Sequence, residues 1–127
     1  MDLEKRMLEA ETRICKAIFP NTTNHFDTLF GGTALQWMDE AAFICATRFT
    51  RQKSVTVSSD KVDFKKSIPA GSIVELVATV KRVGRTSVQI QVDIYLEEMF
   101  KPGKELVING LFTFVAVDEH KKPISIL

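Results

Sequence analysis

Three long segments in the second half of the chain alternate apolar and polar residues, and this pattern constrains the fold more than any other feature. "TSVQIQVDIYL", residues 86–96, places Val88, Ile90, Val92, Ile94 and Leu96 on one face. "SIVELVATVKRV" does the same with Val74, Leu76, Ala78 and Val80, and "ELVINGLFTFVAVD" offers Leu106, Ile108, Phe112 and Phe114 to a core. A period of two predicts strands with one buried face.

The connections between these segments are short. The turn signals "IPAG", "VGR" and "KPG" leave no room for parallel crossovers, so the strands should run in antiparallel succession. "SVTVSS", leading towards "VDF", predicts another strand, and "TRICKAIF", residues 12–19, predicts the first one. The chain should therefore contain about five strands.

One long helix is expected from Gly31 and Gly32 to about Phe49. The helix is apolar over most of its circumference, with a polar stripe formed by Thr33, Gln36, Glu40 and Thr47. A helix this apolar should be wrapped by a curved sheet. We therefore predict an α+β fold in which one long central helix is wrapped by a curved antiparallel sheet. Residues 1–127 should form a single domain, with residues 1–10 as a polar N-terminal tail or short helix.

Composition excludes several classes of function. With 17 basic and 16 acidic residues among 127, the chain lacks the dense positive charge of a nucleic-acid binder. No apolar run approaches the ~20 residues of a membrane span, and the charged N-terminus lacks the apolar middle of a signal peptide. Cys15 and Cys45 match no disulfide or metal-ligand spacing. We expect a cytoplasmic protein without a metal or redox cofactor.

Asp39 is the unusual residue of the helix. Its helical neighbours are Leu35, Ala42, Phe43 and Ala46, and burying an ionised carboxylate among them costs several kcal/mol unless it is hydrogen-bonded. Periodicity leaves two interpretations open. In the first, Asp39 lies at the margin of the buried face of the helix and reaches water or a backbone group. In the second, Asp39 lines a cleft as a general base or nucleophile.

Gly31 and Gly32 bear on this choice because they begin the same helix. The first amides of a helix lack intrahelical partners and carry partial positive charge. Glycines there would let a substrate carbonyl approach these N–H groups, as in an oxyanion hole. A tight turn is the simpler interpretation of the glycines alone. Their pairing with Asp39 favours attack on an acyl carbon.

These residues also carry a resemblance. Asn24 with "LFGGTALQWMDEAA", followed by "VTV", "VDF", "VGRTSVQIQV" and "FTFVAVD", resembles the hot-dog-fold acyl-CoA thioesterases of the cytosolic acyl-CoA hydrolase type, over residues 12–123. The resemblance implies hydrolysis of fatty acyl-CoA to free acid and CoA. Asp39 would be base or nucleophile, Asn24 would position water or the carbonyl, and Gly32 with Gly31 would polarise the carbonyl. It also implies a homodimer as the catalytic unit, with Asn and Asp from opposite protomers, and a trimer of dimers as the larger assembly.

Coenzyme A would be bound as part of the substrate. The resemblance places pantetheine along Val57, Ser58 and Ser59, where strand backbone can pair with its amides. It places a second contact at the "GRTS" turn and the residue after it: Gly84, Arg85, Thr86, Ser87 and Val88. Arg85 could bind phosphate, although a hairpin turn with a solvated arginine explains this segment equally well.

Two alternative functions stay open at this point. An acyl-thioester dehydratase on the same fold would usually need a His/Glu pair, and His25 is the only loop histidine near the helix. A non-catalytic acyl-CoA-binding or regulatory module would keep the fold but has no use for a buried base. Asp39, Asn24 and the two glycines together weigh against the second alternative.

Overall fold

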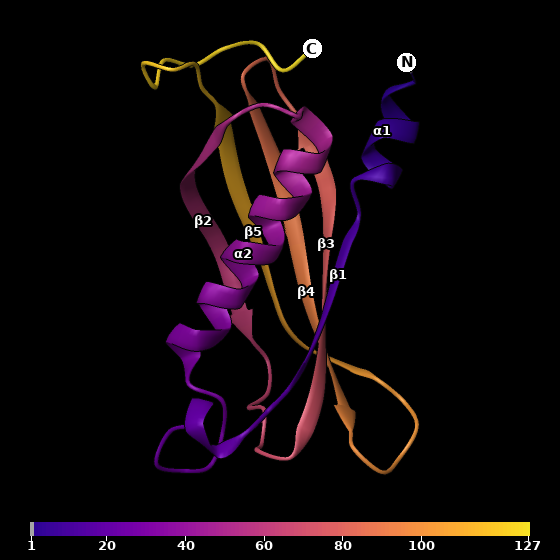
Figure 1. The fold of residues 1–127 in the computed structure, drawn as a ribbon. Coiled ribbons are helices and arrows are strands. Elements are labelled where there is room, and N and C mark those ends of the chain that lie inside the picture. Colours follow the sequence, from indigo (N-terminus) through magenta and orange to yellow (C-terminus); the bar gives the residue numbers. More distant parts are fainter. Residues whose placement is uncertain (1) are drawn as a thin grey trace.

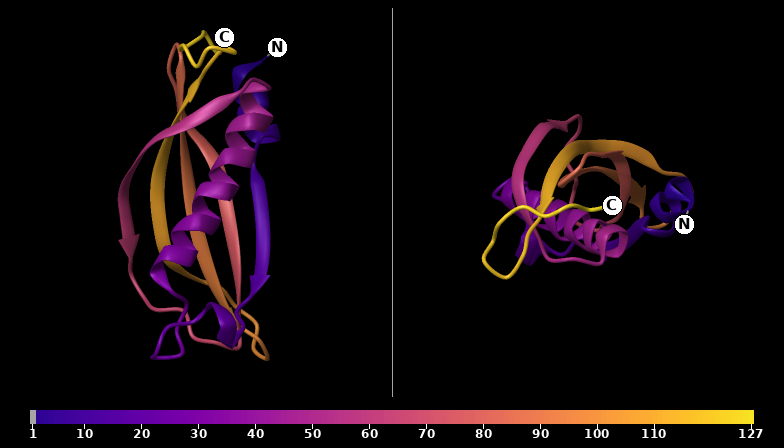
Figure 2. Two further views of the ribbon diagram at one scale, coloured as in Figure 1. Left: turned by 60° about the vertical axis from the view of Figure 1, so that its left-hand side comes forward. Right: turned by 90° about the horizontal axis from the view of Figure 1, so that it is seen from above.

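Five antiparallel strands form one sheet around a single long helix (Figure 1). The computed structural model describes residues 2–127. Its elements are α1 (Leu3–Glu9), β1 (Thr12–Ala17), the short 3-10 helix η1 (Pro20–Thr22), α2 (Gly31–Thr50), β2 (Ser54–Phe64), β3 (Ser72–Val83), β4 (Ser87–Glu98) and β5 (Glu105–Ala116). The strand order is β1-β3-β4-β5-β2, and every neighbouring pair is antiparallel. Seen from above, the sheet curls and α2 lies on its concave side (Figure 2). The predicted architecture is confirmed.

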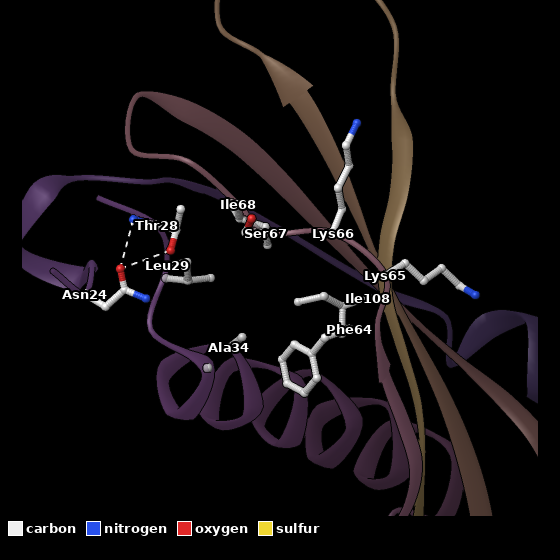
Figure 3. A pocket seen from close by; sticks show the side chains of 11 residues that line it. Asn24, Thr28, Leu29, Ala34, Phe64, Lys65, Lys66, Ser67, Ile68 and Ile108 are labelled. Atoms are coloured by element: carbon white, nitrogen blue, oxygen red, sulfur yellow. Dashed lines mark hydrogen bonds between the residues drawn. The ribbon is translucent and has the colours of Figure 1, made fainter. Parts of the chain in front are cut away.

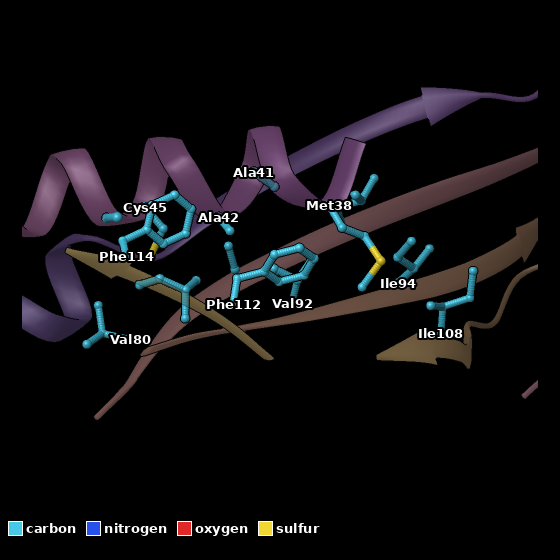
Figure 4. Packing of buried hydrophobic residues seen from close by; sticks show 14 of the residues in the cluster. Met38, Ala41, Ala42, Cys45, Val80, Val92, Ile94, Ile108, Phe112 and Phe114 are labelled. Atoms are coloured by element: carbon cyan, nitrogen blue, oxygen red, sulfur yellow. The ribbon is translucent and has the colours of Figure 1, made fainter. Parts of the chain in front are cut away.

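The alternating segments bury the faces that their patterns predict. Val74, Leu76 and Ala78 of β3 are fully buried, as are the inward residues of β4 from Val88 to Ile94. The helix presents small residues to this surface, because Ala41, Ala42, Cys45 and Ala46 are all inaccessible to solvent. Small side chains let the helix approach the sheet closely. Figure 4 shows Ala42 and Cys45 near the rings of Phe112 and Phe114 from β5.

One predicted core position on β5 is wrong. Leu106 is only half-buried, whereas Val107 beside it is fully buried. The register of β4 and β5 shifts between Ile94 and Tyr95, so Leu106 pairs with Tyr95 while Ile108 pairs with Ile94. An irregularity of this kind changes which face a residue occupies, and a strict period of two cannot anticipate it.

The helix is also less completely covered than its composition predicts. Leu35 and Phe43 keep 37% and 45% of their surfaces exposed, and both lie on the flank of α2 that carries Asp39. Nearly every residue of the neighbouring edge strand β2 is exposed as well, including Val55 and Val57. Among residues 2–127, no further strand pairs with β2. The sheet therefore wraps the helix but leaves this flank of it open.

The N-terminal segment forms a helix that docks on the end of α2. The Asp2 carboxylate caps α1 by accepting from the Glu4 amide at 3.1 Å. Arg6 donates to the Phe49 carbonyl at 2.9 Å, and Arg48 donates to the carbonyls of Glu9 and Glu11. These bonds satisfy backbone acceptors at helix ends. No helix within residues 2–127 combines the length and apolar character needed to cross a bilayer.

Candidate active site

Asn24 is fixed in the loop before α2 by three hydrogen bonds to its side-chain oxygen. Oδ1 accepts from the backbone N–H of Phe26 at 2.9 Å, from that of Thr28 at 3.3 Å, and from the Thr28 hydroxyl at 3.1 Å. Because backbone N–H groups only donate, the oxygen must face them, and the orientation of the amide is settled. The amide nitrogen points away from these bonds, towards the interior of a pocket (Figure 3). Asn24 therefore serves the turn with its oxygen and has donors left for a ligand.

The first residues of α2 provide further donors at the same place. The helix begins at Gly31 after Phe30, which makes no side-chain cap. Within residues 2–127, neither the Gly31 amide nor the Gly32 amide donates to a protein acceptor. A Cβ added at Gly31 would meet nothing within 4 Å, so packing does not require glycine there. The open space instead leaves room for a group that approaches the amides.

Asn24 and Gly31 line one pocket of about 510 Å³ between the start of α2 and the end of β2. The volume lies in the usual range for small-molecule sites. The remaining lining residues are Thr28, Leu29, Ala34, Phe64, Lys65, Lys66, Ser67, Ile68 and Ile108. Lys65 is paired with Asp63 at 3.1 Å, and Lys66 is paired with Glu105 at 3.1 Å. The pocket thus joins helix-start donors to an apolar interior.

Asp39 lies outside this pocket in the isolated chain. It is eight residues along α2 from Gly31, which corresponds to about 12 Å along the helix axis. Its side chain is half-buried beside β2, where Oδ1 accepts a hydrogen bond from the Thr56 hydroxyl at 3.0 Å. The structure therefore brings Asn24 and Gly31 together but does not bring Asp39 to them.

Thr56 is a further candidate site residue, which the sequence alone does not single out. It sits in "SVTVSS", whose alternation is typical of any exposed strand, and a threonine on an edge strand is unremarkable. Only the contact between β2 and α2 shows that its hydroxyl reaches Asp39. A bond to one carboxylate oxygen fixes the side chain and leaves the other oxygen free.

A model of the thioesterase superfamily matches residues 26–101, more than half of the chain. The chain belongs to the thioesterase superfamily. The matched segment contains Asp39, Thr56 and both glycines, while Asn24 lies just before it. An uncharacterised acyl-CoA thioester hydrolase of Bacillus subtilis is 37% identical over 124 residues, which cover 91% of this chain and 72% of the relative.

Solved structures of thioesterases share the fold. An acyl-CoA hydrolase from Staphylococcus aureus, in complex with butyryl coenzyme A, coenzyme A and coenzyme A disulfide, is 37% identical with a TM-score of 0.90. The match covers 94% of this chain and 73% of that one. An apo hexameric acyl-CoA thioesterase has the same TM-score at 34% identity, over 94% of this chain and 76% of its own. The predicted resemblance to hot-dog-fold thioesterases is confirmed.

The strand expected to bind pantetheine is the open edge of this thioesterase. Val57, Ser58 and Ser59 are exposed on β2, which within the described part of the chain pairs with β5 alone. The register shifts between Thr56 and Ser58, so Val57 has no partner in the ladder. Unpaired strand groups are available to a ligand or to another chain. The assignment of these residues to pantetheine stays a prediction.

The turn expected near the phosphates lies far from the Asn24 pocket. The β3–β4 turn sits beside the end of α2, whereas the pocket is at its start (Figure 1). The turn is held by bonds from the Gly84 amide to the Ser87 carbonyl at 2.8 Å and from the Ile126 amide to the Arg85 carbonyl at 2.8 Å. The side chain of Val88 is buried in the core, so at most its backbone can meet a ligand. Within one chain, the two expected parts of the CoA site are not brought together.

Cys45 and Glu75 have shifted pKa values, and neither residue lines the pocket. Burial raises the pKa of the Cys45 thiol to about 12, which keeps it protonated and unreactive at neutral pH. A hydrogen bond from Lys104 lowers the pKa of Glu75 on the outer side of the sheet, away from the pocket. Within residues 2–127, no three His, Cys, Asp or Glu side chains gather closely enough to hold a metal ion.

Proposed function

We propose that this thioesterase hydrolyses fatty acyl-CoA to a free acid and coenzyme A. The observation that carries the proposal is that Asn24 and Gly31, whose backbone amide donates to no acceptor within residues 2–127, line one pocket. Donors at a helix start stabilise negative charge that develops on a carbonyl oxygen. Membership of the thioesterase superfamily and the names of the relatives support a thioester as the group that is attacked.

In this proposal each residue has one role. The thioester oxygen accepts from the Gly32 and Gly31 amides, and Asn24 donates from its free nitrogen to the water or the carbonyl. Asp39 either takes a proton from water, whose oxygen then attacks the acyl carbon, or attacks that carbon itself. In the first route the C–S bond breaks, a C–O bond to the water oxygen forms, and the CoA thiolate takes up the proton that Asp39 removed from the water. In the second route the C–S bond breaks as Asp39 forms an acyl anhydride, which water then hydrolyses to the free acid and the regenerated carboxylate, and a proton of that water goes to the CoA thiolate. Thr56 holds one oxygen of Asp39 in place.

The proposed site is completed by a second copy of the chain. Asp39 and the pocket lie about two turns of α2 apart, so one chain does not present both to a single carbonyl. Leu35 and Phe43 leave apolar surface on either side of Asp39, and the edge of β2 beside them is open. We propose a homodimer in which Asp39 of each copy faces the Asn24 pocket of the other. Two related thioesterases are described as hexameric, which supports a trimer of dimers as the full assembly.

Variants of a relative support the choice of residues. The Staphylococcus aureus hydrolase has been solved with alanine in place of an asparagine, an aspartate and a threonine. These three positions have the same separations along that chain as Asn24, Asp39 and Thr56 have here. A broad-specificity hexameric thioesterase, 27% identical with a TM-score of 0.85, was likewise solved as an aspartate-to-alanine variant.

Substitution of the carboxylate tests the activity. Asp39→Asn should lower the rate of CoA release from butyryl-CoA by roughly a hundredfold or more, because it removes the base or nucleophile while keeping the shape. Glu40→Gln is the matched control, since Glu40 is the next residue on the helix and is exposed to solvent. A control that loses activity equally, or an Asp39→Asn variant with near-normal turnover, would refute the assignment. Binding of acyl-CoA without turnover by the unaltered chain would instead identify a non-catalytic module.

Mixed dimers test the shared site. Asn24→Ala and Asp39→Asn each inactivate both sites of a homodimer, but a dimer with one copy of each retains one site in which both residues are intact. Random reassociation of equal amounts should restore about a quarter of the unaltered activity, since half the dimers are mixed and half their sites are complete. No recovery in mixed dimers verified by mass spectrometry would refute a site that combines Asn24 of one copy with Asp39 of the other.

The structure favours no dehydratase. His25 lies against the ring of Phe26, with 4.0 Å between ring centroids, and no carboxylate within residues 2–127 forms an ion pair with it. The His/Glu pair that such chemistry would need is therefore not assembled by this chain.

A further inference from the structure

The pocket beside Asn24 has both polar and apolar lining residues. Asn24 and Gly31 supply donors at the start of α2. Ala34, Ile68 and Ile108 form an apolar wall of the pocket and are 1%, 2% and 2% exposed. These three side chains offer hydrocarbon surface to a group that enters the pocket.

The apolar wall suits an acyl chain better than the pantetheine arm. Pantetheine carries amide groups, and burying them without hydrogen-bond partners is costly. Ala34, Ile68 and Ile108 have no side-chain donors or acceptors to offer, whereas a hydrocarbon chain needs none. If the thioester carbonyl lies at the helix-start amides, as in the proposed function, the acyl chain is the part of the substrate that lies against this wall.

Phe64 is the one large apolar lining residue that is not buried. It is the last residue of β2, it pairs with Ile108 in the sheet, and it is 49% exposed. Its ring projects across the pocket from the β2 side towards Ala34 on the helix (Figure 3). The ring occupies space that a longer chain would require.

We propose that Phe64 sets the upper limit on the length of the acyl chain that this enzyme hydrolyses. This inference rests on the proposed function. Short chains fit between the donors and the ring, whereas longer chains must displace the ring or leave apolar surface in water. The ring therefore acts on the relative rates for different acyl chains and not on the reacting atoms.

The test is a thiol-release assay over straight-chain acyl-CoAs from acetyl to palmitoyl, with kcat/KM measured for each. Phe64→Ala should shift the longest well-hydrolysed chain to greater length, raising kcat/KM for the first excluded substrate roughly tenfold relative to butyryl-CoA. Phe64→Trp should shift the limit to shorter chains. Phe100→Ala is the matched control, because Phe100 is 94% exposed in the β4–β5 connection and does not line the pocket. Its profile should equal that of the unaltered enzyme.

An unchanged chain-length profile in Phe64→Ala, or an equal loss for every substrate, would overturn the inference while leaving the proposed hydrolase intact. An unaltered enzyme that hydrolyses no acyl-CoA at all would overturn the proposed function itself. If the alanine variant does not fold, Phe64→Leu gives the same comparison with a smaller change in volume. A chain-length limit that follows the size of residue 64 supports the inference in either series.

Discussion

Replacing Thr56 with valine removes one hydroxyl and keeps the shape of the side chain. In the native structure this hydroxyl donates to Oδ1 of Asp39 at 3.0 Å. A hydrogen bond to a charged group contributes about 1.5–3 kcal/mol. Thr56 is exposed and Asp39 is half-buried, so the lower figure applies. Since about 1.4 kcal/mol corresponds to a tenfold change in rate, kcat should fall roughly tenfold if the bond holds Asp39 for reaction.

The effect should appear in kcat and leave KM nearly unchanged, because Thr56 positions the carboxylate and does not itself bind the acyl chain in our proposal. Thr56→Ser keeps the hydroxyl and should recover most of the rate. Thr113→Val is the matched control: it makes the same substitution on β5, at a residue that pairs with Ser58 and has no side-chain bond to Asp39. Thermal unfolding should be similar in all three variants. A Thr56→Val enzyme with unaltered kcat would show that the bond to Asp39 does not matter for turnover.

Two further predictions concern glycine and charge. Gly31→Ala should raise the free energy of unfolding by about 0.4–1 kcal/mol, because Gly31 is helical and an added Cβ would meet no atom within 4 Å. The rate of thiol release should nevertheless fall, because the new methyl group occupies the space through which a carbonyl would approach the amides. Glu75→Gln should destabilise the fold at neutral pH. A hydrogen bond from Lys104, together with the charges of Lys104 and Arg13, lowers the pKa of Glu75 from its ordinary value of 4.5. The ionised carboxylate therefore stabilises the fold above pH 4.5, and this stabilisation is lost as the pH falls through the lowered pKa. Urea unfolding of both variants, repeated for Glu75→Gln at a series of pH values below 4.5 over which the difference from the unaltered protein should shrink, measures these effects.

The fold could be predicted in detail where a residue's environment depends on its own strand. Val74 and Ile90 lie in segments with an unbroken period of two, and both are buried as predicted. The prediction for Leu106 is wrong because a register shift next to Tyr95 on β4 determines which face of the sheet Leu106 occupies. Such a shift leaves no trace in local alternation. The helix bounds followed from the two glycines at its start and from the end of the apolar pattern near Phe49.

The site was predictable only in part. Asp39 stood out because a carboxylate interrupts an apolar face, and the glycines stood out because they begin the same helix. Asn24 looks like an ordinary turn residue, and the structure shows that its oxygen does serve the turn. The resemblance was needed to single it out. The sequence around Thr56 does not mark it as a site residue, because its hydrogen bond to Asp39 joins two residues 17 positions apart in sequence. The cytoplasmic location and the CoA contacts stay predictions.

The open flank of α2 has a physical explanation in the proposed assembly. The helix sequence is apolar on the flank of Leu35, Asp39 and Phe43, yet this chain leaves that flank open beside an unpaired strand edge. The same helix provides donors at its start and a carboxylate two turns later, too far apart to act on one carbonyl. A two-fold partner that brings a second α2 alongside in the opposite direction would cover the apolar flank and set each Asp39 against the other copy's donors. A single arrangement would thus bury the apolar flank of α2 and complete the active site. For this reason we infer that two copies of the chain share both the interface along α2 and the active site.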